Sequence, residues 1–148
     1  MQSSQRKILL ICEHDGVLLK YTEILNVLGL FWIVTCNSFH EARRLMARNG
    51  QFDYLFYDGF SGSRWYDLLV FRDNIKNIVL FAELGEAQRL IALRWAQQEG
   101  ISRLAILPRP VMPHHIHEVI TFPGNNKVSV EIADRRGGEY DPVAADAV

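Results

Sequence analysis

The chain has 148 residues, of which 49% are hydrophobic and 22% are charged, and its formal net charge is −1. This length and composition suit one soluble domain with a substantial core. There is no basic excess for binding phosphate backbones, so we expect no nucleic-acid partner. No apolar run approaches the roughly 20 residues that span a bilayer, so we expect no membrane segment.

The amino terminus and the cysteines indicate a cytoplasmic protein. Residues 1–6 are polar and lack the apolar core of an export signal. Cys12 and Cys36 lie at or near the ends of predicted strands and form no paired framework. We therefore expect buried, reduced thiols.

Short apolar strands alternate with helical patterns along the chain. The first helix is expected to begin at Asp15 as its cap, and Ser38 with Glu41 forms a capping box for the second. This alternation predicts an α/β fold, a doubly wound five-stranded parallel sheet. The expected elements are strand 8–11, helix 15–28, strand 31–35, helix 38–49, strand 54–57, short helix 65–72, strand 78–81, helix 86–99, strand 104–107 and helix 113–121.

Two acids stand at the carboxyl ends of predicted strands. In the flavodoxin-like strand order 2-1-3-4-5, ligands bind where the first and third strands leave the sheet. Those strands lead into Glu13 and Asp58. Two carboxylates in one crevice suit a cation or a phosphoryl group, and the alternative is a pair of solvated residues at strand ends.

Acids follow the first predicted strand, Asp58 follows the third, and Arg109-Pro110 follows the fifth. At the ends of these three strands, the chain resembles the receiver domain of bacterial response regulators. The resemblance covers about residues 5–122. It implies a site in which the acids and the aspartate bind Mg²⁺, and in which the aspartate accepts phosphate from a histidine kinase. In that family a hydroxyl after the fourth strand and a lysine after the fifth bind the phosphoryl group. The lysine–proline peptide is usually cis.

The first departure from the family concerns the metal. Cys12 stands where the first acid of the strand-1 pair would be, and Glu13 matches the second. A thiol is a soft ligand, whereas Mg²⁺ prefers hard oxygen ligands in near-octahedral geometry. Glu13 and Asp58 alone would hold Mg²⁺ weakly, with Asp15 as a further acid nearby. We therefore expect no cofactor, and Mg²⁺ only if Asp58 is a working acceptor.

The second departure concerns the phosphoryl group. Phe81, followed by Ala82, stands at the hydroxyl position, and Arg109 replaces the lysine before Pro110. Phe81 removes a hydrogen bond to phosphate. Arg109 keeps the positive charge in a longer, planar group, which suits a standing pair with Asp58. The resemblance therefore indicates an atypical, degenerate pseudo-receiver whose phospho-acceptor position is inactive.

Apolar residues outside this pocket indicate a protein interface. Tryptophan and tyrosine are favoured interface anchors, and helix 86–99 has a wider apolar stripe than a surface helix needs. In receivers, the face of the fourth helix, fifth strand and fifth helix is the usual dimer and output surface, so we expect a homodimer. The alternative is that the aromatics cover the short helix 65–72. The predicted interaction surface is Phe60, Trp65, Tyr66, Leu90, Leu93, Arg94 and Trp95.

We expect a signalling protein that contacts a kinase, regulator or effector independently of phosphorylation and turns over no substrate, so not an enzyme. The first alternative is a single-domain response regulator phosphorylated on Asp58 in a two-component phosphorelay. The second is a small ligand-binding α/β domain, which the lack of a glycine-rich loop after the first strand disfavours.

The composition changes near the carboxyl terminus. Residues 123–148 lack the apolar pattern of a core, so we expect a flexible tail after a receiver-like domain spanning 5–122. Within this tail, residues 127–132 alternate polar and apolar side chains. The alternative is a sixth strand on a sheet edge, in this molecule or a neighbour.

Overall fold

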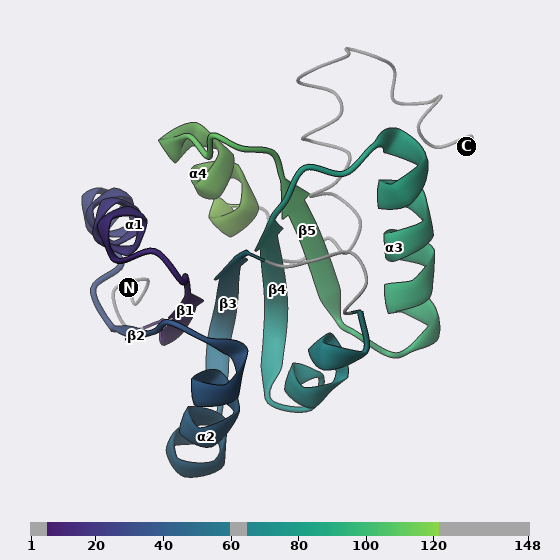
Figure 1. The fold of residues 1–148 in the computed structure, drawn as a ribbon, viewed down its shortest axis with the longest axis horizontal. Helices are drawn as coiled ribbons and strands as arrows, with labels where there is room; N and C mark the ends of the chain where they lie inside the picture. Colours follow the sequence, from purple (N-terminus) through teal and green to yellow (C-terminus); the bar gives the residue numbers. More distant parts are fainter. Residues whose placement is uncertain (1–5, 60–64, 122–148) are drawn as a thin grey trace.

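The computed structural model describes residues 6–59 and 65–121, which form a parallel sheet with helices on both faces (Figure 1). Phe60 and the predicted tail, 123–148, lie outside the described residues. None of the described helices is long and apolar enough to cross a bilayer. The elements are β1 (Ile8–Ile11), α1 (Asp15–Val27), β2 (Ile33–Cys36), α2 (Phe39–Asn49), β3 (Phe52–Asp58), η2 (Trp65–Phe71), β4 (Ile75–Phe81), α3 (Glu86–Gln98), β5 (Arg103–Leu107) and α4 (Pro113–Thr121).

The sheet confirms the predicted topology. Its five strands are parallel in the order β2-β1-β3-β4-β5. Because β1 and β3 are neighbours, their carboxyl ends meet at the switch point of the sheet. Ile11 lies beside Tyr57, and Asp58 lies beside Phe81 at the end of β4. The register therefore brings the strand ends predicted to form the crevice to one edge of the sheet.

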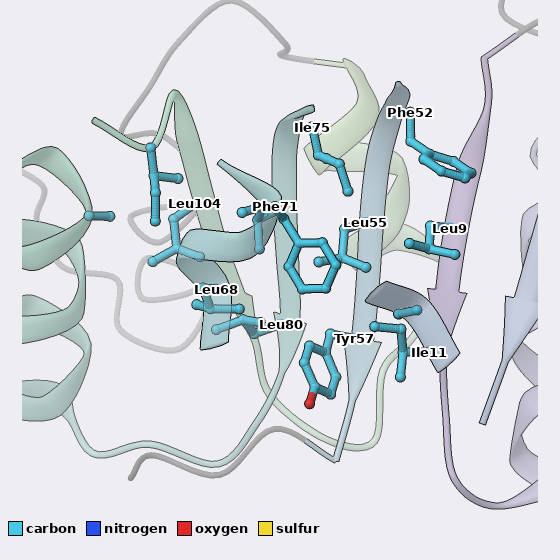
Figure 2. Close-up of a cluster of buried hydrophobic side chains, with 14 of the residues drawn as sticks. Leu9, Ile11, Phe52, Leu55, Tyr57, Leu68, Phe71, Ile75, Leu80 and Leu104 are labelled. Atoms are coloured by element: carbon cyan, nitrogen blue, oxygen red, sulfur yellow. The ribbon is translucent and has the colours of Figure 1, made fainter. Parts of the chain in front are cut away.

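Two apolar layers cover the two faces of the sheet. On one face, α1 and α4 pack over Leu10, Phe56 and Phe81. On the other, α2, η2 and α3 pack over Leu9 and Leu55 and their neighbours. Figure 2 shows this second layer, with Leu68 and Phe71 of η2 lying against side chains of the central strands. Burial on both faces explains why the strand sequences are continuous apolar runs.

The starts of the first two helices differ in part from the predictions. Asp15 is the first helical residue of α1, and His14 holds the cap position without a side-chain cap bond. The prediction that Asp15 caps this helix was wrong. Its carboxylate lies in the first turn, where it favours the helix through the macrodipole.

In α2, Ser38 Oγ accepts from the Glu41 amide at 3.1 Å, as predicted. Glu41 Oε1, however, accepts from the amide of residue 37 at 3.2 Å, rather than from that of Ser38.

Two other elements differ in detail. The strand predicted over 31–35 is observed as Ile33–Cys36. The Ile33 amide donates to the Phe31 carbonyl at 3.1 Å, so a local turn precedes the regular ladder. The short helix predicted over 65–72 is a 3-10 helix, Trp65–Phe71. This 3-10 helix lies in the connection between β3 and β4, whereas each of the other connections between strands of the sheet contains an α-helix.

Candidate functional site

Asp58 ends β3 at the predicted crevice. Its residue is only 6% exposed, so the carboxylate is largely withdrawn from water. Gly59 follows with φ +102°, a conformation that glycine adopts without steric cost. The crevice is a cleft of about 480 Å³ lined by residues from α1 and from the ends of β1, β3, β4 and β5. The lining residues among those predicted for the site are Glu13, Asp58, Arg109 and Pro110.

Arg109 neutralises Asp58. Its Nη2 lies 2.7 Å from Asp58 Oδ1, and the same nitrogen donates to the Phe81 carbonyl oxygen at 3.3 Å. The short contact is an ion pair rather than an aligned hydrogen bond, since Oδ1 accepts no hydrogen bond of good geometry from the described residues. The Arg109–Pro110 peptide is cis, as the resemblance implies. The predicted standing pair is therefore present.

Cys12 contacts the other carboxylate oxygen. Its Sγ lies 3.6 Å from Asp58 Oδ2 and 3.5 Å from the His14 carbonyl oxygen. Burial is the main cause that raises the pKa of the Cys12 thiol, and the negative charge of Asp58 raises it further. The thiol therefore stays protonated at neutral pH and can donate to the carboxylate. Cys12 is therefore a weak hydrogen-bond donor to Asp58.

Tyr21 is a member of this site that was not among the residues predicted for it. It lies on α1, lines the cleft and is 6% exposed. Burial raises the pKa of its phenol well above the ordinary range, and interaction with the Asp58 carboxylate adds to the effect. Its ring centroid lies 4.7 Å from that of Phe81. A hydroxyl from α1 thus approaches Asp58, whereas the end of β4 offers an aromatic ring.

Phe81 and Ala82, two further residues predicted for the pocket, are both buried. Phe81 is 1% exposed and stacks between Tyr21 and Phe56, so its ring belongs to the core beneath Asp58. Ala82 is also buried, and its amide donates to the Leu107 carbonyl at 3.0 Å. Neither residue is among those that line the cleft, and neither carries a polar side chain.

The acids do not gather into a metal site. Glu13 is exposed and lines the cleft, while Asp15 is exposed in the first turn of α1 and is not among the lining residues. Within residues 6–59 and 65–121, no group of three or more His, Cys, Asp and Glu side chains is placed to hold a metal ion. Both oxygens of Asp58 already face Arg109 and Cys12. This donor set fits Mg²⁺ poorly.

The predicted interaction surface is partly buried. Trp65, Leu93 and Trp95 are partly buried and pack against the core, with the two tryptophan rings 5.7 Å apart. Much of the apolar area of these three residues already packs against the core, and their place in a contact surface stays a prediction. Tyr66 is 76% exposed and Leu90 is 40% exposed. Arg94 is exposed as well.

The side of α3 that packs against the sheet carries small residues. Ala92 and Ala96 are buried against the sheet, and these small side chains occupy the contact face. Ile91, on the solvent side, is 63% exposed. The exposed large apolar side chains of η2 and α3 are therefore Tyr66 and Val70 on η2 and Leu90 and Ile91 on α3.

The chain matches no protein-family model and no curated protein sequence. It is similar to the crystal structure of a pilus assembly-related protein from Burkholderia pseudomallei, with a TM-score of 0.62 and 15% identity over 82% of this chain and 90% of that one. It is also similar to the signal receiver domain of a LuxO repressor protein from Vibrio parahaemolyticus. There the TM-score is 0.56 and the identity 12%, over 89% of this chain and 95% of that one. Identities this low establish a shared receiver-like fold and leave the function to the site.

Proposed function

We propose that this chain is an atypical receiver-fold protein that acts in bacterial signal transduction by phosphorylation-independent contact with a protein partner. It turns over no substrate. The observation that carries the proposal is the 2.7 Å ion pair between Arg109 Nη2 and Asp58 Oδ1. The similarity to a signal receiver domain supports the signalling context.

The surroundings of Asp58 oppose phosphoryl transfer to its carboxylate in three ways. An attacking carboxylate oxygen must reach the phosphorus in line with the leaving group, and a metal ion normally neutralises the phosphoryl oxygens. Here one oxygen is paired with Arg109 and the other lies beside the Cys12 thiol. The buried ring of Phe81 offers no hydroxyl to a phosphoryl group. Among the described residues, acceptor chemistry at Asp58 therefore lacks a free carboxylate oxygen, a set of ligands suited to Mg²⁺ and one hydrogen-bond donor.

A standing pair also removes the usual signal. Phosphorylation acts by adding negative charge that reorganises nearby donors. In this pocket the charge of Asp58 is balanced by Arg109, a residue of the same chain. The conformational state is then set by what binds the surface, because a partner shifts an equilibrium only through its different affinity for the two states.

The surface that we assign to the partner is formed by Tyr66, Leu90 and Ile91. It spans η2 and α3, which the Trp65–Trp95 contact joins. A partly apolar surface bearing an exposed tyrosine is typical of a protein interface. Arg94, exposed on the same helix, supplies a charged group for its rim.

The experiment is a pull-down from the native cell with wild type and three variants. We expect Asp58→Asn to recover the same partner as wild type, with or without acetyl phosphate. Ile91→Asp should lose it. Leu19→Asp is the matched control, since Leu19 is 62% exposed on α1 and Ile91 is 63% exposed on α3. Recovery of the partner only after acetyl phosphate treatment, or its loss in Asp58→Asn, would contradict the proposal.

The cleft favours one alternative function, the binding of a small ligand. Its volume of about 480 Å³ lies within the range of small-molecule sites. Lys20 and Arg109 could orient an anionic group from opposite walls. A thermal-shift screen with nucleotides and flavins tests this alternative, and a shift that Arg109→Gln abolishes would favour it.

A further inference from the structure

The edge strand β2 lacks the features that protect most sheet edges. It lies at the outer side of the sheet, with β1 as its neighbour within the sheet (Figure 1). The segment 31–36, Phe-Trp-Ile-Val-Thr-Cys, contains no charged residue, proline or glycine. Natural edge strands usually carry a charge, a proline or a bulge that prevents pairing with another chain. Uncharged β-formers without proline are the residues most prone to such pairing.

Large apolar side chains flank this edge and face solvent. Val27, at the end of α1, is 81% exposed, and Phe31 and Trp32, just before β2, are 63% and 51% exposed. Lys7 Nζ lies 5.3 Å from the Trp32 ring centroid, which fixes the indole at the edge of the sheet. The opposite edge differs, because no residue of β5 is more than 4% exposed. The sheet thus has one covered edge and one apolar, accessible edge.

The hydrogen bonds to β1 fix which backbone groups face outward. The carbonyls of Trp32 and Cys36 accept from the amides of Ile8 and Cys12, at 2.9 and 3.0 Å. Backbone groups alternate direction along a strand. Thr35, one position from Cys36, therefore directs its amide and carbonyl away from β1. Its side chain is exposed as well.

We propose that β2 is a dimerisation edge, at which a second copy of this chain pairs antiparallel across a two-fold axis through Thr35. The two Thr35 residues would face each other and exchange both N–H···O bonds, as in a hydrogen-bonded antiparallel pair. The two five-stranded sheets would become one continuous sheet. This proposal goes beyond the proposed function, since it does not depend on the state of Asp58 or on the identity of the partner.

The available apolar area is sufficient for a dimer with a second copy of this chain. Aromatic side chains present about 150–250 Å² each, so the exposed parts of Val27, Phe31 and Trp32 amount to about 350 Å². A two-fold axis doubles this to about 700 Å² of apolar area. Since about 57% of a typical interface is apolar, the whole interface would approach about 1,200 Å². That is the lower limit for stable, specific complexes.

The first test is cysteine cross-linking under mild oxidation. In the proposed pair the two Thr35 Cα atoms lie about 5.5 Å apart, within the range that a disulfide bridges. Thr35→Cys should form a covalent dimer readily. Leu90→Cys is the matched control, because it reports on α3, part of the usual receiver dimer face, and is 40% exposed. The native thiols of Cys12 and Cys36 are buried. Equal cross-linking of both variants, preferential cross-linking of Leu90→Cys, or none in either would overturn the proposal.

The second test is sedimentation of variants without added cysteines. Proline is tolerated on an edge strand where the N–H faces solvent. Thr35→Pro should therefore keep the wild-type circular dichroism spectrum and remain monomeric. Wild type and Thr35→Ala, which both keep the N–H, should form dimers as their concentration rises. A wild-type protein that stays monomeric at its highest soluble concentration, or a folded Thr35→Pro that dimerises like wild type, contradicts the proposal. If Thr35→Pro does not fold, the cross-linking result decides.

Discussion

The Arg109–Asp58 pair makes a prediction that a double-mutant cycle can test. Arg109→Gln removes the cation and leaves the carboxylate of Asp58, whose side chain is 8% exposed, beside a neutral thiol. A buried charge without its partner destabilises the folded state. Asp58→Asn removes the charge instead. Arg109→Gln should therefore lower the free energy of unfolding in the wild type and have little effect in Asp58→Asn.

The coupling energy follows from the geometry. Two unit charges 2.7 Å apart attract by about 6 kcal/mol at an effective dielectric constant of 20 and by about 1.5 kcal/mol in bulk water. The Arg109 side chain is 43% exposed, so water screens the pair and the value falls toward the lower limit. We expect a coupling of about 2 kcal/mol.

Urea unfolding of wild type, both single variants and the double variant at neutral pH gives this coupling directly. Arg44→Gln, at an exposed position on α2, controls for the loss of one positive charge. Additive effects of the two substitutions, with a coupling below about 0.5 kcal/mol, would show that the ion pair does not stabilise the fold. An Arg109→Gln substitution that raises the free energy of unfolding would lead to the same conclusion.

Three further predictions follow from the core and the pocket. Burial raises the pKa of Cys36 to about 12 from an ordinary value of 9.0, so the folded protein keeps this proton while the unfolded chain loses it above pH 9. The free energy of unfolding should then fall with rising pH, by at most about 1.4 kcal/mol per pH unit from this group. Urea unfolding of Cys36→Ala above pH 9 should show a shallower dependence of the free energy of unfolding on pH. The same dependence in wild type and Cys36→Ala would contradict the prediction. Phe71→Ala, at a fully buried residue, should lower the free energy of unfolding by about 3–5 kcal/mol. Val70→Ala, at a residue 38% exposed, should change it by less than about 1 kcal/mol. Similar losses of stability in the two variants would refute the packing of η2 against the core. Tryptophan fluorescence of the wild type should not respond to Mg²⁺. The double variant Cys12→Asp with Arg109→Lys, which adds an acid and shortens the cation, should respond. A wild-type response at the same Mg²⁺ concentrations would refute the conclusion that this pocket fits Mg²⁺ poorly.

The topology was predictable because its signals are local. Continuous apolar runs such as Leu9–Ile11 and Leu55–Tyr57 are typical of strands buried on both faces, and the helices between them require parallel pairing. The position of Asp58 at the crevice follows from that topology alone. Pro113 was likewise a sufficient signal for the start of α4, which runs to Thr121 as predicted.

The site was less predictable, because it depends on which way side chains point. Tyr21 falls in the apolar periodicity of α1, so the sequence indicates a core residue, while its phenol reaches Asp58. Arg103 precedes an apolar strand and gives no signal of burial, although it is 4% exposed. Its guanidinium donates to the Val119 carbonyl at 2.9 Å and so ties β5 to the end of α4. A side chain that carries both apolar and polar groups can serve the core and a site at once.

The exposed faces of helices were the least predictable feature. On α3 the sequence offers both Leu90 with Ile91 and Ala92 with Ala96 as apolar pairs, and larger side chains suggest the inner face. The structure buries the alanines instead, because small side chains let the helix approach the sheet closely. Periodicity gives the width of an apolar stripe, whereas packing decides which part of it is covered.

The most direct test of the central claim is whether Asp58 becomes phosphorylated. The chain is incubated with acetyl phosphate and Mg²⁺, and the acyl phosphate is trapped chemically and located by mass spectrometry. We predict no labile phosphate on Asp58 in the wild type, because Arg109 and Cys12 engage both carboxylate oxygens. Asp58→Asn sets the background. An acyl phosphate on Asp58 of the wild type, above that background, would contradict the account and favour a phosphorylated response regulator.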